Sequence, residues 1–427
     1  MLTLRVGKIM TRKLFIRLLA ALTVLAAGSC SVGEDFGFSP GEEASGKSSS
    51  GNTRAPSEEN RHVFIMYAAA YNDLQGYIVP DMRDLRSGYI PGDTRDDDVL
   101  LVFSKESVSD YDFATKVNPV LYRLSKDSEG TVTADTLKVW PDTVLAASAE
   151  TLHDVLTEVK DRFYAKSYGL VFSSHASGWV PPLYYYNPSL FESKSPISAR
   201  SIGMDVVENN RYEIDLKDFA KAIPMHLDYI LFDACLMGCV EVAYELKDVT
   251  DVVGFSQTEV MAEGFDYLTI SSRLVGDGNP DPIGVCVDYF AQYDSPDQKD
   301  PYATVSAVDC RKLDNLAAVC KDLISRYRNL LDTVDPGRVQ RYYRGSRHFF
   351  YDLRDIFQKA NVPDEDLSAL DAAIDASILY RAHTDYFLTI PITTFSGYSM
   401  YLPADGTAYL DNYYTTLAWN KAVELVK

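Results

Sequence analysis

A thiol and an imidazole each follow an apolar run in the middle of the chain. His175 comes directly after YGLVFSS (168–174), and Cys235 comes directly after YILFDA (229–234). A thiolate is a strong nucleophile, and a neighbouring imidazole can lower the thiol pKa and protonate a leaving amine. The two side chains could therefore work together as a Cys–His dyad.

The elements that carry these residues favour this interpretation. Both runs are short and dense in apolar side chains, which predicts strands buried on both faces. Adjacent parallel strands lie about 4.8 Å apart, so side chains at their carboxyl ends can face each other, in the region where open α/β sheets bind ligands. We expect a helix to start near Cys235 or Met237, and its positive end would favour the thiolate.

Each residue also has an ordinary structural explanation. A Cys after an apolar strand is most often a small buried hydrophobe, and a His at a strand end is most often a hydrogen-bonded core residue. Zinc is a weaker alternative, because the chain has no second Cys/His pair at finger-like spacing. We predict no metal site, and we expect four cysteines in the core: Cys239, Cys286, Cys310 and Cys320.

The rest of the chain alternates predicted strands and helices, which indicates an α/β fold with a mostly parallel sheet covered by helices. The predicted strands are 62–70, 98–104, 168–174, 229–234 and 303–308, and the first helices are 149–166 and 213–223. After residue 311 the pattern is helical, at 313–334, 348–360 and 365–382. A late strand, GYSMYLP (397–403), is expected to return to the sheet, so we divide this part into a catalytic domain (59–310) and a helical C-terminal part (311–427).

The N-terminus is typical of an export signal. Residues 1–29 carry five basic and no acidic side chains, followed by a ten-residue apolar run and Gly28-Ser29-Cys30. This ending resembles a bacterial lipobox, in which Cys30 becomes the lipid-modified first residue; the alternative is ordinary signal cleavage with Cys30 incidental. Residues 30–58 then form the lipid-attachment Cys and a flexible linker poor in large apolar side chains.

The composition limits the partners. The 427 residues are 46% apolar and 24% charged, as in ordinary globular proteins, and the formal charge is −20. Removing residues 1–29 takes five from the 41 basic residues, so 36 face 61 acidic ones and the charge becomes −25. Nucleic acid is therefore excluded as an expected partner, because an acidic protein repels phosphate backbones.

The segment around Cys235 resembles the clostripain family of cysteine peptidases, within the caspase-like clan that includes gingipains and legumains. The pattern is YILFDACLMGCVEVAYELKDVTDVVGFSQTEVMAEGFDY (229–267), which joins an apolar strand ending in Asp-Ala-Cys, an E-x-A-Y-E-L helix and a Glu-Gly-aromatic-x-Tyr segment. His175, some 60 residues earlier, fits the clan's order of His before Cys. The resemblance spans about residues 59–427.

The resemblance implies a caspase-like α/β/α sandwich that cleaves peptide bonds. Cys235 would be the nucleophile and His175 the general acid, and the backbone N–H groups of Ala176 and Cys235 would hold the oxyanion. Asp233 matches the acid that faces the P1 side chain in the family, which implies cleavage after Arg or Lys. Its structural alternative is an N-cap for the next helix.

Further residues are candidates for the substrate pocket. Trp179 could line its wall, although an aromatic residue there is equally often part of the core. A second acid is expected among three residues that local sequence does not separate: Glu259, Glu263 and Asp266.

The sequence departs from the clan pattern directly after His175. Gly is usual there, and this chain has Ala176. If the position needs a positive φ, Ala costs roughly 1 kcal/mol or turns its N–H away from the oxyanion, which would weaken activity. Gly178, two residues later, could compensate in part.

The segment from Ser177 to Asn210 is longer than an ordinary loop and has no periodicity. Family members commonly mature by cutting themselves between the His and Cys strands. We therefore predict autocleavage at one of the basic residues available here: Lys194, Arg200 or Arg211.

These observations predict a lipid-anchored endopeptidase of the bacterial cell envelope, periplasmic or on the outer-membrane surface, with Arg- or Lys-containing protein or peptide substrates. One alternative is an inactive surface lipoprotein that binds peptides or partners through the same cleft, and another is a thiol-dependent acyl or amide transferase. We expect no required cofactor. Some relatives depend on calcium, but the chain has no D-x-D-x-D-G loop, so a calcium requirement is left open.

Overall fold

The computed structural model describes residues 60–427, except 93–97, 110, 111, 113, 182, 183, 185–201, 209, 277, 296, 297, 299, 300 and 346–348. The chain divides into two compact units, residues 1–55 and 56–427, and all described residues belong to the second. Cys30, Lys194 and Arg200 lie outside the described residues.

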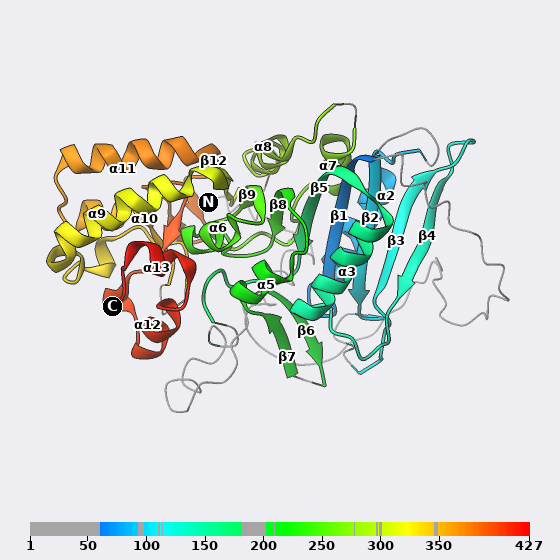
Figure 1. The fold of residues 1–427 in the computed structure, drawn as a ribbon, viewed down its shortest axis with the longest axis horizontal. Coiled ribbons are helices and arrows are strands. Elements are labelled where there is room, and N and C mark those ends of the chain that lie inside the picture. Colours follow the sequence, from blue (N-terminus) through cyan, green and yellow to red (C-terminus); the bar gives the residue numbers. More distant parts are fainter. Residues whose placement is uncertain are drawn as a thin grey trace, which may run out of the picture. The chain divides into compact units, whose positions relative to one another are not determined.

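A nine-stranded sheet forms the centre of this unit, in the order β12-β10-β9-β8-β5-β1-β2-β3-β4 (Figure 1). Its strands are β1 (Asn60–Ala70), β2 (Asp98–Glu106), β3 (Val120–Lys126), β4 (Val132–Val139), β5 (Ala165–Ser173), β8 (Leu227–Asp233), β9 (Thr250–Phe255), β10 (Thr304–Asp309) and β12 (Ile378–His383). Three small two-stranded sheets pair β6 (Ile202–Val207) with β7 (Asn210–Ile214), β11 (Tyr351–Asp352) with β15 (Ser399–Met400), and β13 (Tyr386–Phe387) with β14 (Ile390–Pro391).

The middle of the large sheet is parallel and its two sides are antiparallel. Strands β9, β8, β5, β1 and β2 run parallel, whereas β10 and β12 on one side and β3 and β4 on the other pair antiparallel. From β1 the chain moves to β2 on one side, and from β5 it moves to β8 on the other. The order therefore reverses between β1 and β5, and at such a switch point the loops beyond the carboxyl ends diverge and leave a crevice.

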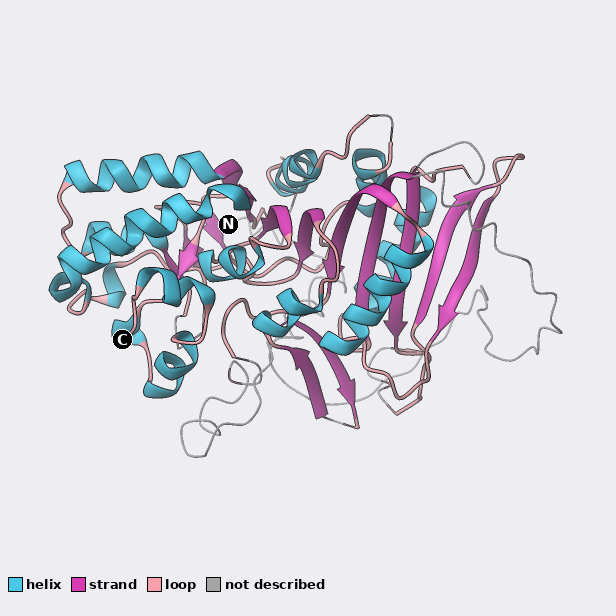
Figure 2. Cartoon of the chain, in the orientation of Figure 1, coloured by secondary structure: helices cyan, strands magenta, loops and turns pink. Residues whose placement is uncertain are grey.

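Helices cover both faces of the sheet, as Figure 2 shows. One face packs α2 (Gln75–Ser87), α7 (Tyr267–Leu274) and α8 (Pro282–Tyr293), and the other packs α3 (Ala149–Arg162), α5 (Leu216–Ala222) and α6 (Val240–Leu246). Helix α3 shows why a helix packs on the sheet, because its apolar residues Leu152, Leu156 and Val159 recur on one side. Ser148 caps this helix by accepting a hydrogen bond from the Thr151 N–H. The α/β/α sandwich predicted from the sequence is confirmed.

The C-terminal part adds five helices, α9 (Leu313–Leu331), α10 (Leu353–Lys359), α11 (Asp364–Ser377), α12 (Ala408–Tyr414) and α13 (Ala418–Val423), and three short 3₁₀ turns, η1 (Cys310–Lys312), η2 (Pro336–Arg338) and η3 (Pro403–Asp405). Two predictions here are wrong. The late strand at 397–403 does not return to the central sheet, because β15 pairs with β11 instead. The helix predicted over 365–382 ends at Ser377, and β12 follows directly and pairs with β10 at the sheet edge.

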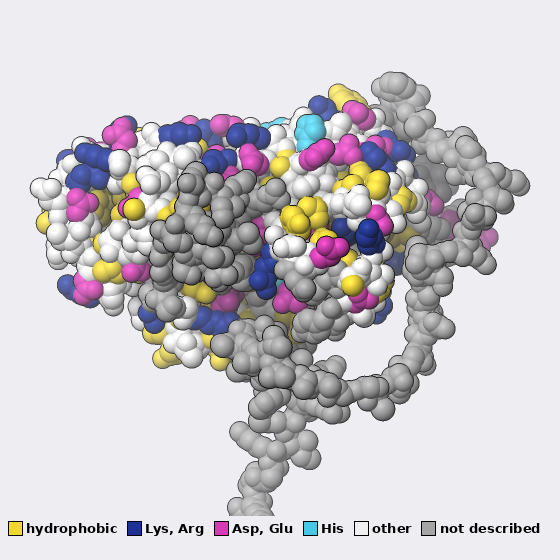
Figure 3. Space-filling view, turned by 90° about the horizontal axis from the view of Figure 1, so that it is seen from below, with side chains coloured by type: hydrophobic (Ala, Val, Ile, Leu, Met, Phe, Trp, Pro, Cys, Tyr) yellow, Lys and Arg dark blue, Asp and Glu magenta, His cyan; other side chains and the backbone are white. Residues whose placement is uncertain are grey.

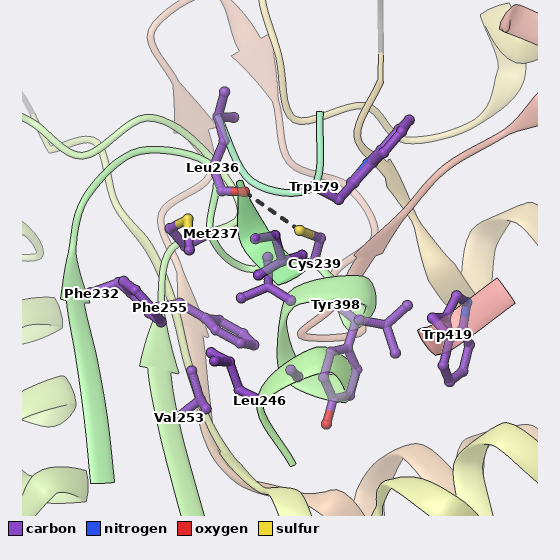
Figure 4. Close-up of a cluster of buried hydrophobic side chains, with 14 of the residues drawn as sticks. Trp179, Phe232, Leu236, Met237, Cys239, Leu246, Val253, Phe255, Tyr398 and Trp419 are labelled. Carbon is purple, nitrogen blue, oxygen red and sulfur yellow. Dashed lines mark hydrogen bonds between the residues drawn. The ribbon is translucent and has the colours of Figure 1, made fainter. Parts of the chain in front are cut away.

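One hydrophobic core joins the C-terminal part to the sheet. Figure 4 shows side chains from the strands (Phe232, Phe255), from the turn after Cys235 (Leu236, Met237, Cys239) and from the C-terminal part (Tyr398, Trp419) in one cluster. The Cys239 thiol donates to the Leu236 carbonyl oxygen at 3.7 Å. The expected burial of Cys239, Cys286, Cys310 and Cys320 is confirmed.

The surface carries both signs of charge. On the face drawn in Figure 3, acidic, basic and apolar side chains are interspersed and do not form one acidic patch. None of the helices in the described part of the chain combines the length and the apolar character needed to cross a bilayer.

Candidate active site

The two predicted dyad residues lie beyond the ends of neighbouring strands. Strands β5 and β8 pair in parallel, with Ser173 opposite Asp233. His175 and Cys235 each follow that pair by two residues, so they occupy equivalent positions at the same edge of the sheet. Among the described residues no hydrogen bond joins the imidazole to the thiol. The imidazole instead contacts Asp73, and the thiol contacts the backbone of Val260.

The Cys235 thiol rests against the backbone of Val260. Its sulfur accepts a hydrogen bond from the Val260 N–H at 3.4 Å and donates to the Val260 carbonyl oxygen at 4.0 Å. Burial, together with the charges of Glu259 and Asp233, raises the thiol pKa to about 12, against the opposing effects of the Val260 N–H and Arg344. Burial and the two carboxylates thus favour the neutral thiol over the thiolate.

The helix expected at Cys235 begins later than the sequence suggested. Helix α6 starts at Val240 with Cys239 at its N-cap position, so the prediction of a helix start near Cys235 or Met237 is wrong. The intervening turn is strained, because Leu236 has a φ of +62°. Backbone bonds from Leu236 N–H to Thr258 and from Gly238 N–H to Ser256 hold the turn in place.

His175 is held by a carboxylate that the sequence analysis did not single out. Its Nε2 atom lies 2.7 Å from Oδ1 of Asp73, in the loop after β1. Partial burial acts against ionisation of Asp73, but the hydrogen bond and charge of His175, with smaller help from the backbone and Arg211, hold the pKa of this carboxyl below its usual value. A search beyond the carboxyl end of every central strand would have found it, because Asp73 follows the apolar run of β1 by three residues.

Asp233 lies at the end of β8, two residues before the nucleophile, and is buried. Its Oδ2 accepts a hydrogen bond from the Tyr267 hydroxyl at 2.9 Å, and the Phe265 N–H also bonds it. Burial raises its pKa to about 6 despite these bonds. Gly264, with a φ of +56°, closes over the carboxylate, and a Cβ there would lie 2.4 Å from Oδ2. The N-cap alternative does not hold, since Cys239 occupies the N-cap position of α6, without a side-chain cap hydrogen bond.

The structure separates the three candidates for a second acid. Glu263 acts electrostatically with Asp233 on Asp81, a residue of α2 that the sequence analysis did not identify. Burial and the charges of Asp233, Asp84 and Glu263, in that order, raise the pKa of Asp81 to about 9. Glu259 instead pairs with Arg344 at 3.0 Å, and Asp266 caps α7 by accepting from the Leu268 N–H.

The backbone around Ala176 does not carry the strain considered above. Ala176 is not among the described residues with positive φ, whereas Gly178 has a φ of +60°. A Cβ at Gly178 would lie 2.5 Å from the Leu236 carbonyl oxygen, so this glycine lets the His175 loop contact the Cys235 turn. None of the hydrogen bonds between described residues uses the N–H of Ala176 or of Cys235.

Trp179 is not a wall of the pocket, and that prediction is wrong. Its side chain is 0% exposed and packs on Tyr401 and Tyr414, and its indole N–H donates to the Phe349 carbonyl oxygen at 3.3 Å. The aromatic side chains of the C-terminal part bury it. Of the predicted cleavage points only Arg211 is described, and it lies in β7, where it pairs with Val206.

An α/β/α sandwich with a thiol and an imidazole beyond two neighbouring parallel strands has the architecture of a caspase-like cysteine peptidase. The model of the clostripain family, Peptidase C11, matches residues 66–425, and the chain belongs to this family. It is accordingly a cysteine endopeptidase that acts on protein or peptide substrates.

Solved structures agree with this assignment. An inactive zymogen C11 protease from Parabacteroides distasonis is 26% identical with a TM-score of 0.70, and covers 86% of this chain and 99% of its own. A secreted C11 cysteine protease from Bacteroides thetaiotaomicron is 27% identical with a TM-score of 0.70 and the same coverage. A third structure is a secreted C11 cysteine protease from B. thetaiotaomicron in complex with an irreversible peptide inhibitor. It is 22% identical with a TM-score of 0.68, the match covers 86% of this chain and 99% of that protein, and it supports the fold. No curated protein matches the chain.

Proposed function

We propose that this peptidase cleaves after Arg or Lys, with Cys235 as the nucleophile and His175 as the proton-transfer residue. The observation that carries the specificity is the buried Asp233 carboxylate two residues from the nucleophile, in an acidic environment. Glu263 and Asp81 add to this environment, as the raised pKa of Asp81 to about 9 indicates. A guanidinium or ammonium group would pair with the Asp233 carboxylate and favour the ionised form of these acids, whereas a neutral side chain would not.

The reaction proceeds in two steps. The sulfur leaves Val260 and attacks the scissile carbonyl carbon, forming an S–C bond while its proton passes to His175. The imidazolium gives that proton to the amine as the C–N bond breaks, and a thioester remains. Water, deprotonated by the imidazole, then hydrolyses the thioester and restores the thiol. The N–H groups of Ala176 and Cys235 stabilise the oxyanion in both steps.

Peptides that differ only at P1 test this proposal. We expect cleavage after Arg or Lys and little after citrulline, which has the shape of Arg without its charge. Asp233→Asn is expected to lower kcat/KM for the Arg peptide by about 10²-fold, because it removes the partner of a buried cation. Cys235→Ala should abolish cleavage. Equal cleavage of the Arg and citrulline peptides would overturn the specificity, and an inactive wild type would favour the binding-protein alternative.

We further propose export and attachment to the cell envelope through Cys30. Residues 1–29 have the pattern of an export signal, and the similar B. thetaiotaomicron protease is described as secreted. Labelled palmitate is expected to enter the wild type and not Cys30→Ala. Equal labelling of wild type and Cys30→Ala would rule out a lipid anchor at Cys30.

Autoprocessing is proposed at Lys194, Arg200 or Arg211. Wild type is expected to convert from one chain to two on storage, whereas Cys235→Ala stays intact. Conversion of Cys235→Ala at the same rate would contradict this step.

We propose that no cofactor takes part, because the thiol, the imidazole and the backbone N–H groups supply every step. Activity should be unchanged in EDTA. A loss that only Ca²⁺ restores would contradict this.

A further inference from the structure

Three consecutive strands of the sheet, β8, β5 and β1, are followed within two or three residues by Cys235, His175 and Asp73. The contact between His175 and Asp73 joins the loops that follow β5 and β1, where the order of strands reverses. The hydrogen bond is 2.7 Å long, in the range of charge-assisted bonds, and joins side chains that remain 23% and 41% exposed. Neither side chain is buried deeply enough to need this partner for folding alone.

The atoms involved matter for the chemistry. Because Nε2 bonds Asp73, it carries the proton in the neutral imidazole, and Nδ1 is left as the nitrogen that exchanges a proton with the thiol and the leaving amine. A carboxylate at Nε2 also stabilises the imidazolium that forms once the thiol has given up its proton. This effect is needed here, because burial and two carboxylates disfavour the thiolate of Cys235.

We propose that Asp73 is a positioning residue that fixes the tautomer of His175 and stabilises its protonated form, so that the site works as Cys235–His175–Asp73. This inference rests on the proposed role of the dyad. The carboxylate in the loop after β1 would thus act on proton transfer through His175.

Other charged groups that bear on a pH measurement are known from the structure. Arg211 of β7 acts on Asp73, and Glu259, Asp233 and Arg344 act on the thiol. None of them is substituted in an Asp73→Asn variant, so a change in the pH profile is attributed to the loss of the Asp73 charge.

The experiment uses the full chain and compares wild type with Asp73→Asn, Asp73→Glu and Asp112→Asn. Asp112 is the control, a loop carboxylate beyond the neighbouring strand β2 that, within the described part of the chain, accepts hydrogen bonds from Ala114 and Thr115 of its own loop. Two readouts are followed against pH: kcat/KM on the Arg peptide, and the rate of iodoacetamide alkylation of the Cys235 peptide measured by mass spectrometry.

We expect Asp73→Asn to lower kcat by about 10- to 100-fold with little change in KM, and to move the acid limb of both profiles to lower pH, because the imidazolium loses the carboxylate that stabilises it. Asp73→Glu should recover part of the loss, and Asp112→Asn should match wild type. Thermal unfolding checks that the variants fold.

The outcomes separate the two proposals. If wild type cleaves the Arg peptide and Asp73→Asn equals it in both profiles, the role of Asp73 is overturned while the proposed function stands. If wild type does not cleave, the proposed function fails, and the alkylation profiles still decide whether Asp73 controls the dyad.

Discussion

At the scale of single residues, the environment of Cys235 is set by charges of both signs. Glu259 acts against the thiolate and Arg344 favours it, and these two side chains form an ion pair with each other. Arg344 belongs to the C-terminal part, so a residue more than 100 positions away tunes the nucleophile. The acid that the sequence suggested as a pocket residue is therefore one half of this pair.

Substituting either member of this ion pair should change the reactivity of Cys235, and the two substitutions should change it in opposite directions. Arg344→Gln leaves Glu259 uncompensated and should slow alkylation of Cys235 near neutral pH, whereas Glu259→Gln should accelerate it. We expect roughly 3- to 10-fold changes that shrink at high salt, because both side chains are partly exposed, 40% and 21%.

Asp288→Asn is the control, since it breaks the exposed Arg273–Asp288 pair on the helices of the other face. Changes of the same sign in both site variants would contradict the electrostatic explanation.

At the scale of elements, two catalytic loops are held together by a close backbone approach. Gly178 follows His175 by three residues, and its α-carbon faces Leu236, Phe350 and Cys239. The contact fixes the loop after β5 against the turn after β8. It thereby sets the separation of the imidazole and the thiol.

Gly178→Ala should therefore reduce both stability and turnover. Its Cβ would lie 2.5 Å from the Leu236 carbonyl oxygen, and its φ of +60° is unfavourable for alanine. Gly130→Ala is the matched control, because Gly130 has a φ of +83° and a Cβ added there would meet no described atom within 4 Å. In urea unfolding we expect a loss of about 1 kcal/mol for the control and roughly 3 kcal/mol or more for Gly178→Ala, with lower kcat only in the latter. Equal losses would show that the close approach is unimportant.

The elements also show what sequence could predict. Strands β1, β2, β5, β8 and β10 stand out as apolar runs, because burial on both faces needs no alternation. The β3–β4 hairpin was not predicted, since β4 is an exposed edge strand with few apolar residues. The helix prediction extended over strand β12 because its residues continue the α11 pattern without a Gly or Pro stop.

The site was predictable to the same degree. Cys235 and His175 each follow an apolar strand and Asp233 ends one, so their placement at the same edge of the sheet could be predicted from sequence. The roles of Asp73, Asp81 and Arg344 depend on contacts between distant segments. Trp179 was wrongly predicted to line the pocket, because the residues of the C-terminal part that bury it are distant in sequence.

At the scale of the whole molecule, α6 ties the sheet to the C-terminal part. The Glu241 carboxylate, which is fully buried, accepts hydrogen bonds from the Tyr401 N–H at 2.9 Å and the Tyr414 hydroxyl at 2.6 Å. Glu245 accepts from the Ala418 N–H at 2.8 Å. These bonds fix the helix that follows the nucleophile to the segments that bury Trp179, so loosening the C-terminal part should disturb the active site.

Glu241 also makes stability depend on pH. Burial raises its pKa from 4.5 to about 7 despite both hydrogen bonds, so between these pH values the folded protein holds a proton that the unfolded chain has lost. Stability from this group therefore falls as pH rises through this range, by on the order of 3 kcal/mol in total. Glu241→Gln should flatten the dependence of the free energy of unfolding on pH between 5 and 7 and be the more stable form at pH 8, whereas Glu129→Gln, in an exposed turn, should leave the wild-type slope unchanged. A Glu241→Gln variant with the wild-type slope in urea titrations at several pH values would mean that this buried carboxyl stays ionised in the folded protein.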